Sequence, residues 1–177
     1  MNTDNMLTEE KDYRTEEDSI GTKAVPGSVY YGVQSLRAAE NFRITGLNMH
    51  PEIINSLAYI KKACAVTNCE VGILDRKIAD AIAKACDEIL EGKMHKDFIV
   101  DPIQGGAGTS INMNANEVIA NRAIEILGGK KGDYSIVNPN DHVNCGQSTN
   151  DVIPTAGKMT SLRLLKNLKE ELLRLHK

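Results

Sequence analysis

Residues 138–151 read NPNDHVNCGQSTND, a polar run that ends where an apolar helical pattern begins. Its last four residues, Ser148 to Asp151, are all types that favour the N-cap of a helix, and one helix needs only one cap. The first turn of a helix carries free N–H groups and a partial positive charge, to which hydroxyl and amide side chains add further donors. The run therefore indicates either a site for an anion, such as a carboxylate, or a well-capped helix after an Asn-rich turn.

Residues 152–177, which follow directly, have the pattern of a long helix. Leucines recur at spacings of three and four and form a stripe, which comprises Leu165, Leu168, Leu172 and Leu175 and is widened by Leu162 and Leu164. A stripe of this length needs partner helices to cover it. Because the pattern runs to the last residue without a C-cap signal, we expect the chain to be a piece of a longer protein; an oligomer interface is the alternative.

A second motif, GGAGTSINMNANEVIANR, occupies residues 105–122. Its glycines predict a flexible loop before a helix, and Thr109 or Ser110 is expected to cap that helix. The loop lacks the Gly-Lys-Ser/Thr ending of a phosphate-binding loop, and Ile111 stands where the dinucleotide fingerprint has its third glycine. The motif therefore does not indicate nucleotide binding.

The predicted helix in this motif contains four asparagines, although asparagine is a poor helix former. Asn112 and Asn116 share one face at a spacing of four, and Asn114 and Asn121 share another at a spacing of seven. An exposed helix would favour Glu or Lys at these positions. We interpret the asparagines as a buried hydrogen-bonded network that fixes the preceding loop, or as a polar interface with another helix.

The remaining segments predict a mainly α fold with one short extended hairpin. Residues 1–12 are expected to form a disordered tail, residues 13–24 the hairpin, and residues 35–42 a short helix. Residues 51–72 and 75–92 have the pattern of a helical hairpin. The buried faces of these two helices are expected at Ile53, Leu57, Ile60, Cys64 and Val71, and at Ile78, Ile82, Ala85 and Ile89.

The composition argues against several classes of protein. The 177 residues carry a net charge of −3 with scattered positive residues, which does not favour binding to nucleic acid. No apolar run approaches the ~20 residues of a membrane span, and residues 1–12 lack the apolar region of a signal peptide. We therefore expect a cytoplasmic protein without a membrane partner. The four cysteines lack metal-ligand spacing and are expected to be free thiols, mostly buried, so no metal site is expected.

The two motifs, together with GTKAVPGSVYYGVQSLRAAENF at residues 21–42, resemble the aspartase/fumarase superfamily over nearly the whole chain after the tail. The resemblance implies a mainly α fold with an N-terminal lyase domain at residues 13–147. Residues 148–177 would be the first part of a long helix in the central helical domain. The sequence GGAGTS and Asn138 are similar to the aspartase branch, whereas class II fumarases usually carry His at position 138 and Ser-Ser-Asn at residues 148–150.

The resemblance implies reversible anti-elimination of ammonia from L-aspartate to give fumarate, with no metal or organic cofactor. Removal of the weakly acidic C3 proton builds a doubly charged aci-carboxylate, which needs dense hydrogen-bond donors where the charge develops. A homotetramer is implied, with L-aspartate or fumarate as the small-molecule partner. Hydration of fumarate to malate is the alternative within the superfamily. A small helical module whose leucine stripe binds a partner helix is the alternative of another class.

A match of the motifs position by position assigns the substrate contacts that the resemblance implies. Ser148 and Thr149 would hold the side-chain carboxylate of aspartate, and Thr109 would reach the same region. Asn150 would contact the amino group of the substrate. These four residues are the substrate-binding residues that the sequence predicts.

Asn140 and Asp141 match a secondary pocket of the fumarases, although Asn138 replaces the histidine of that pocket. His142 is expected to have a structural role, because the general base of the superfamily is a serine elsewhere. That serine lies in a mobile loop with the signature Gly-Ser-Ser-x-Met-Pro-x-Lys-x-Asn-Pro, which the sequence lacks. No catalytic residue is therefore expected in this chain. The base would lie beyond Lys177, and the chain alone would be inactive.

Overall fold

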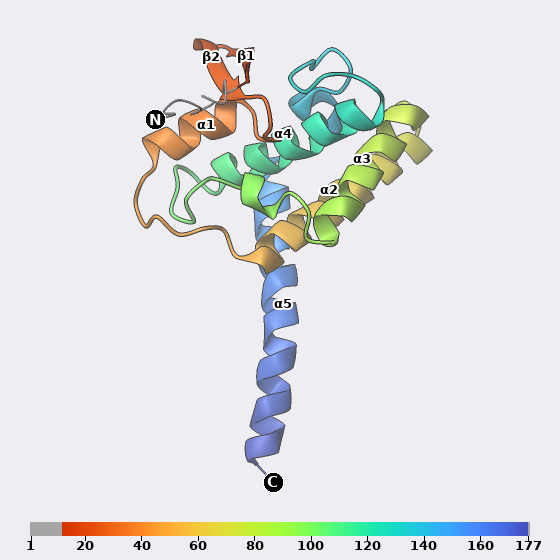
Figure 1. Ribbon diagram of the computed structural model, residues 1–177. Helices are drawn as coiled ribbons and strands as arrows, with labels where there is room; N and C mark the ends of the chain where they lie inside the picture. The colour runs from red at the N-terminus through yellow and green to blue at the C-terminus, as the bar shows by residue number, and fades with distance from the viewer. Residues whose placement is uncertain (1–11, 177) are drawn as a thin grey trace, which may run out of the picture.

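Helices form one layer beneath a small β-hairpin, and one long helix projects away from this layer, in a computed structural model that describes residues 12–176 (Figure 1). The elements are β1 (Tyr13–Asp18), β2 (Gly21–Pro26), α1 (Val33–Asn41), α2 (Pro51–Glu70), α3 (Arg76–Leu90), the 3₁₀ turn η1 (His95–Asp97), α4 (Thr109–Ile126), the π-helical turn η2 (Pro139–Val143) and α5 (Thr149–Leu175). The predicted mainly α fold with one hairpin is confirmed. The predicted tail, apart from Asp12, lies outside the described residues.

The hairpin that the sequence predicted pairs β1 with β2 in antiparallel register, from Tyr13 opposite Pro26 to Asp18 opposite Gly21. The Asp18 carboxylate stabilises the turn by accepting hydrogen bonds from the backbone N–H groups of Ile20 and Gly21, at 2.9 and 3.2 Å. An Asp at this position of a tight turn supplies the acceptor that the backbone lacks.

Helices α2 and α3 form the predicted helical hairpin. Asp75 caps α3 by accepting hydrogen bonds from the N–H groups of Lys77 and Ile78. The predicted buried face of α3 is confirmed for Ile82, Ala85 and Ile89, all of which are fully buried.

The buried face of α2 differs from the prediction. It comprises Ile54, Ser56, Leu57, Ala58, Lys61 and Ala65. Of the predicted residues, Leu57 is buried, Ile53 and Ile60 are half-buried, and Val71 is exposed beyond the end of the helix. The buried face of α2 is rotated relative to the predicted face, because α2 packs against both α3 and α5. Residues from two adjoining stripes of the helix are therefore buried.

Helix α4 lies in the middle of the helical layer (Figure 1) and buries all four of its asparagines. The Asn114 side chain accepts a hydrogen bond from Ile99 N–H and donates one to the Asp97 carbonyl, both at 2.9 Å. The Asn121 side chain donates to the Tyr30 carbonyl and accepts from Gly132 N–H, at 2.9 and 2.7 Å. The prediction is therefore confirmed in part: the asparagines are buried, and Asn114 and Asn121 fix connecting segments at residues 97–99, Tyr30 and Gly132, which are not the glycine loop before α4. The Asn116 side chain has no hydrogen-bond partner within residues 12–176.

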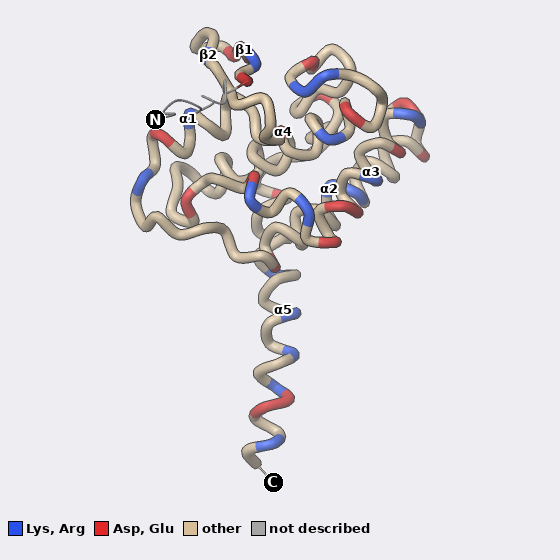
Figure 2. The backbone as a smooth tube through the Cα atoms, viewed as in Figure 1, with Lys and Arg blue, Asp and Glu red and all other residues tan. Residues whose placement is uncertain are grey.

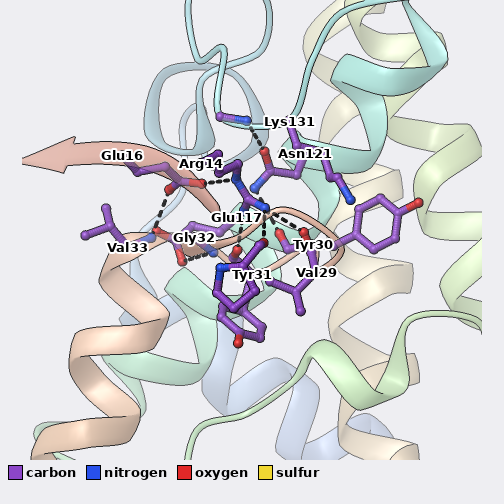
Figure 3. A network of polar contacts seen from close by, with 12 residues as sticks. Arg14, Glu16, Val29, Tyr30, Tyr31, Gly32, Val33, Glu117, Asn121 and Lys131 are labelled. Carbon is purple, nitrogen blue, oxygen red and sulfur yellow. Dashed lines mark hydrogen bonds and ion pairs between the residues drawn. The ribbon is translucent and has the colours of Figure 1, made fainter. Parts of the chain in front are cut away.

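A buried carboxylate on α4 caps helix α1 from outside. Glu117 accepts hydrogen bonds from the backbone N–H groups of Gly32, Gln34 and Ser35, at 2.9 to 3.0 Å (Figure 3). Glu16 on β1 accepts one from Val33 N–H at 2.9 Å. Burial raises the pKa of Glu117, and the surrounding N–H donors oppose that shift. The two carboxylates together satisfy the N-terminal donors of α1, which has no side-chain cap of its own.

The expected cap of α4 was wrong. Gly108, with a positive φ of 88°, is the N-cap of α4, so Thr109 is its first residue and neither Thr109 nor Ser110 caps it. The loop turns through a left-handed conformation that glycine adopts without strain, and this turn moves the predicted capping residues inside the helix. Within the polar run at residues 138–151, η2 buries Pro139 and Val143.

The outer part of α5 is the projecting segment in Figures 1 and 2. Every residue from 161 to 176 is exposed, and charged side chains are spread along this segment (Figure 2). The exposed leucines are Leu162, Leu164, Leu165, Leu168, Leu172, Leu173 and Leu175, with exposed fractions from 44% to 84%. The predicted leucine stripe is therefore uncovered within residues 12–176. No helix in this range is long and apolar enough to cross a membrane.

We expect Gly32→Ala to destabilise the chain by about 2 kcal/mol or more, because a Cβ atom there would overlap the buried Glu117 carboxylate. The added atom would lie 2.7 Å from Glu117 Cδ and would also overlap the Tyr134 hydroxyl. Urea denaturation of the two proteins would measure the difference. Gly157→Ala on α5 is the matched control, because an added Cβ there meets no atom within 4 Å. A Gly32→Ala protein as stable as this control would contradict the capping arrangement.

Candidate functional site

The polar run at residues 138–151 ends in a complete helix cap. Ser148 is the N-cap of α5, and its hydroxyl oxygen accepts a hydrogen bond from Asn150 N–H at 3.1 Å. The Asp151 carboxylate accepts one from Ser148 N–H at 3.1 Å, which completes a capping box. The interpretation of this run as a well-capped helix is confirmed.

The cap also leaves hydroxyl protons available to a ligand. A hydroxyl group has one proton to donate and two lone pairs that accept. The Ser148 oxygen accepts from Asn150 N–H, and the Thr149 oxygen accepts from Asn112 Nδ2 at 3.3 Å. Both hydroxyl groups therefore retain their protons at a helix N-terminus that already favours negative charge. Capping and anion binding are compatible at this position.

Lys61 lies beneath the loop that leads into α5, and its side chain is fully buried. Its Nζ donates hydrogen bonds to Asn144 Oδ1 at 2.8 Å and to Gln147 Oε1 at 2.9 Å. Asn112 Nδ2 donates to the same Asn144 oxygen at 3.1 Å. Burial lowers the pKa of Lys61 to about 7, against the opposing influence of nearby cysteine thiols. A buried lysine therefore joins α2 to the loop, and Asn144 joins the loop to α4.

The prediction from sequence missed Lys61, which stands in a Lys-Lys pair that is typical of an exposed face. A signal was nevertheless present in the spacing. Lys61 follows Ile54 by seven residues and Leu57 by four, and it precedes Ala65 by four. These positions share one face of a helix, so Lys61 belongs to the buried stripe.

Thr109 and the start of α5 come from the two sequence motifs, and the structure places these motifs against each other. A Cβ atom added to Gly108 would lie 2.9 Å from Ile153 Cγ2, so the loop before α4 packs on the first turns of α5. Thr109 and Asn150 are exposed and Thr149 is half-buried. The predicted substrate-binding residues therefore cluster where α4 and α5 begin.

A cavity lies on the apolar side of this contact. It has a volume of about 460 Å³ and is lined by Ile111, Ile153 and Ala156 among others, but by none of the four predicted substrate-binding residues. The polar side, with the hydroxyl groups, is open to solvent in this chain. A site that encloses a substrate would need further walls, formed by residues other than 12–176.

Asn140 and Asp141, the predicted secondary pocket, are both exposed in η2. Asn140 lines a cavity of about 510 Å³ together with Gln34, Arg37 and Asn138, whereas Asp141 does not line it. The secondary pocket therefore stays a prediction. His142 Nδ1 accepts a hydrogen bond from Asn138 N–H at 2.9 Å, which agrees with the structural role expected for this histidine.

Comparison with known proteins places the chain in a family. The family described as lyase matches residues 21–177, which is most of the chain. The chain belongs to the lyase family. The resemblance to the aspartase/fumarase superfamily and the fold class that it implied are thereby confirmed.

Several members of this lyase family are similar along nearly the whole chain. An aspartate ammonia-lyase from Bacillus subtilis (strain 168) is 60% identical over 163 residues, which are 92% of this chain and 34% of the relative. A class II fumarate hydratase from Halobacterium salinarum is 52% identical over 157 residues, 89% of this chain and 33% of the relative. The chain thus spans about a third of the length of these relatives.

A solved structure has the same fold over the same extent. The crystal structure of fumarate lyase:delta crystallin from Brucella melitensis in native form superposes with a TM-score of 0.89 at 47% sequence identity. The match covers 92% of this chain and 37% of the solved chain.

Among residues 12–176, no three His, Cys, Asp or Glu side chains lie close enough together to hold a metal ion.

The buried lysine predicts a specific pH dependence of stability. The folded pKa of Lys61 is about 7 and its ordinary value is 10.5, so between these values the unfolded chain binds a proton that the folded chain does not. The free energy of unfolding should therefore rise with pH in this window, by up to about 1.4 kcal/mol per pH unit.

Urea denaturation between pH 7.5 and 9.5 would measure this rise, and Lys61→Met should abolish the part that Lys61 contributes. Lys62→Met, on the adjacent and partly exposed position, is the matched control and should leave the rise unchanged. Identical pH profiles for the unaltered chain and Lys61→Met would contradict the lowered pKa.

Proposed function

We propose that the whole protein is an aspartate ammonia-lyase, which interconverts L-aspartate with fumarate and ammonia, and that this chain supplies one wall of the substrate site. The observation that carries the proposal is the start of α5, where Ser148 and Thr149 accept hydrogen bonds through their oxygens and keep their protons for an anion. The identity of 60% to an aspartate ammonia-lyase supports the same substrate class.

The chemistry explains why such donors are needed. The C3 proton of aspartate lies beside a carboxylate and is weakly acidic, so its removal builds a second negative charge on that carboxylate. Preorganised donors lower the barrier when they point to the oxygens on which this charge develops. Two hydroxyl groups and the positive end of a helix meet this requirement without a metal ion or organic cofactor.

Each predicted residue has a role in this proposal. Ser148 and Thr149 bind the side-chain carboxylate of aspartate, and Thr109 reaches the same carboxylate from the adjoining α4. Asn150 contacts the amino group that leaves. Asn140 and Asp141 belong to a secondary pocket.

The general base and the other walls of the site come from outside these 177 residues. The superfamily's base is a serine in a mobile loop whose signature the sequence lacks, so we expect the 177-residue chain alone to show no turnover. The exposed leucines of α5 support assembly into a homotetramer through a helical bundle. We place the protein in the cytoplasm.

Hydration of fumarate to malate is the second candidate, because a class II fumarate hydratase is 52% identical to the chain. The full-length protein would be assayed with fumarate in the presence and absence of ammonia. Consumption of fumarate only when ammonia is present supports the aspartate ammonia-lyase. Formation of malate without ammonia supports the hydratase and would overturn our first proposal.

In the full-length protein, Thr149→Val should lower kcat/KM for aspartate by about 100-fold, as is typical for the loss of one donor to a developing oxyanion. Ser148→Ala should have an effect of similar size. Steady-state kinetics of fumarate formation would measure both. Thr155→Val is the matched control on the same helix, because the Thr155 hydroxyl donates to the Asp151 carbonyl and is absent from the proposed site. Unchanged kcat/KM in Thr149→Val and Ser148→Ala would remove these residues from the site.

A further inference from the structure

Two side-chain amides, Asn144 and Asn112, connect the buried Lys61 to Thr149 at the start of α5. Lys61 Nζ donates to Asn144 Oδ1 at 2.8 Å, and Asn112 Nδ2 donates to the same oxygen at 3.1 Å. Asn112 Nδ2 also donates to Thr149 Oγ1 at 3.3 Å. We refer to Lys61, Asn144, Asn112 and Thr149 as the amide relay. It runs from α2 through the loop and α4 to the proposed carboxylate site.

The lysine sets the direction of each hydrogen bond in the amide relay. A side-chain amide can present either its oxygen or its nitrogen, and the choice depends on its neighbours. Lys61 has at least two protons on Nζ in either protonation state, so it can donate to Asn144 and Gln147 at the same time. Both amides therefore turn their oxygens toward it.

The amide nitrogens of these two side chains then have acceptors of their own. Asn144 Nδ2 donates to the Gln147 carbonyl at 3.0 Å, and Gln147 Nε2 donates to the Val143 carbonyl at 2.9 Å. The orientation imposed by Lys61 is thus supported on the opposite side of each amide. The loop of residues 143–147 is held in one hydrogen-bonding arrangement.

Asn112 completes the relay. Because Asn144 presents an oxygen, Asn112 must present Nδ2, and the same Nδ2 reaches the Thr149 oxygen. This orientation leaves Asn112 Oδ1 buried and without a hydrogen-bond partner among residues 12–176. An unpartnered buried carbonyl oxygen disfavours this orientation, so a neighbour must impose it. Lys61, through Asn144, is the group that does so.

We propose that Lys61 is a positioning residue, which fixes the polarity of the amide relay so that the Thr149 hydroxyl accepts from Asn112 and donates its proton to the substrate carboxylate. This inference rests on the proposed function, because it assigns Lys61 a role at the same site. The lowered pKa of Lys61 does not weaken it, since the neutral amine retains enough protons for both hydrogen bonds.

A double-mutant cycle in the full-length protein tests the proposal. Lys61→Met keeps the apolar stem and removes the donors, and we expect it to lower kcat/KM for aspartate by about tenfold or more. In the Thr149→Val background the hydroxyl is already absent, so Lys61→Met should cause little further loss. Lys62→Met is the matched control on the same helix and should keep the kcat/KM of the unaltered protein.

A purely structural role for Lys61 predicts a different result. In that case Lys61→Met would lower stability, and its effect on kcat/KM would be the same with and without the Thr149 hydroxyl. Equal effects in the two backgrounds, or no effect at all, would overturn the proposal. Should Lys61→Met fail to fold, Asn144→Leu interrupts the relay without changing the lysine, and the same coupling to Thr149→Val is expected.

Failure of the proposed function would be recognised separately. If the unaltered full-length protein converts neither aspartate nor fumarate, the proposed function is wrong. The polarity of the relay is then decided by NMR of the side-chain amides. Hydrogen-bond couplings from Asn112 Nδ2 toward Asn144 Oδ1 support it, and an Asn144 Nδ2 group directed at Lys61 would overturn it.

Discussion

The fold depends on a constraint within α4, which is buried along most of its length although it carries four asparagines and a glutamate. Burial of a polar group costs free energy unless a hydrogen-bond partner is supplied. For four of these five side chains the partners come from the connecting segments: Asn114 and Asn121 hold loops, Glu117 holds the start of α1, and Asn112 reaches the start of α5. The Asn116 side chain has no partner within residues 12–176. The irregular parts of the chain are therefore positioned by one helix, and the candidate site is one of these parts.

Much of this arrangement could be predicted from the sequence, because periodicity and capping residues act locally. The hairpin, the helical pair α2 and α3 and the cap at Ser148 all follow from such local signals. The spacing places Lys61 on the buried stripe of α2, but its hydrogen-bond partners could not be predicted in this way, since Asn144 and Gln147 lie 83 and 86 residues further along the chain. The cap of α4 was missed because Gly108 takes a backbone conformation that side-chain preferences do not encode.

In the proposed function, the candidate site would use the same hydroxyl groups for stability and for ligand binding. Ser148 stabilises α5 through its oxygen, and its proton remains for a substrate. Replacement of such a residue changes both the stability of the fold and the binding of the ligand. The two effects can be separated only by comparison with a variant that changes one of them and leaves the other unaltered. The two interpretations of residues 138–151 from sequence are therefore compatible in one structure, in which the cap is observed and anion binding is our proposal.

The exposed outer part of α5 has a further consequence for the order of folding and assembly. Residues 161–175 are exposed within the described chain, although Arg163 lies over the Tyr59 ring and pairs with Glu52, and an isolated helix of about 15 residues is only marginally stable in water. Their helix content therefore depends on the concentration of whatever covers the leucines. Coil-to-helix conversion of this segment and burial of its leucines form one coupled equilibrium, so circular dichroism of the chain should report association as well as secondary structure.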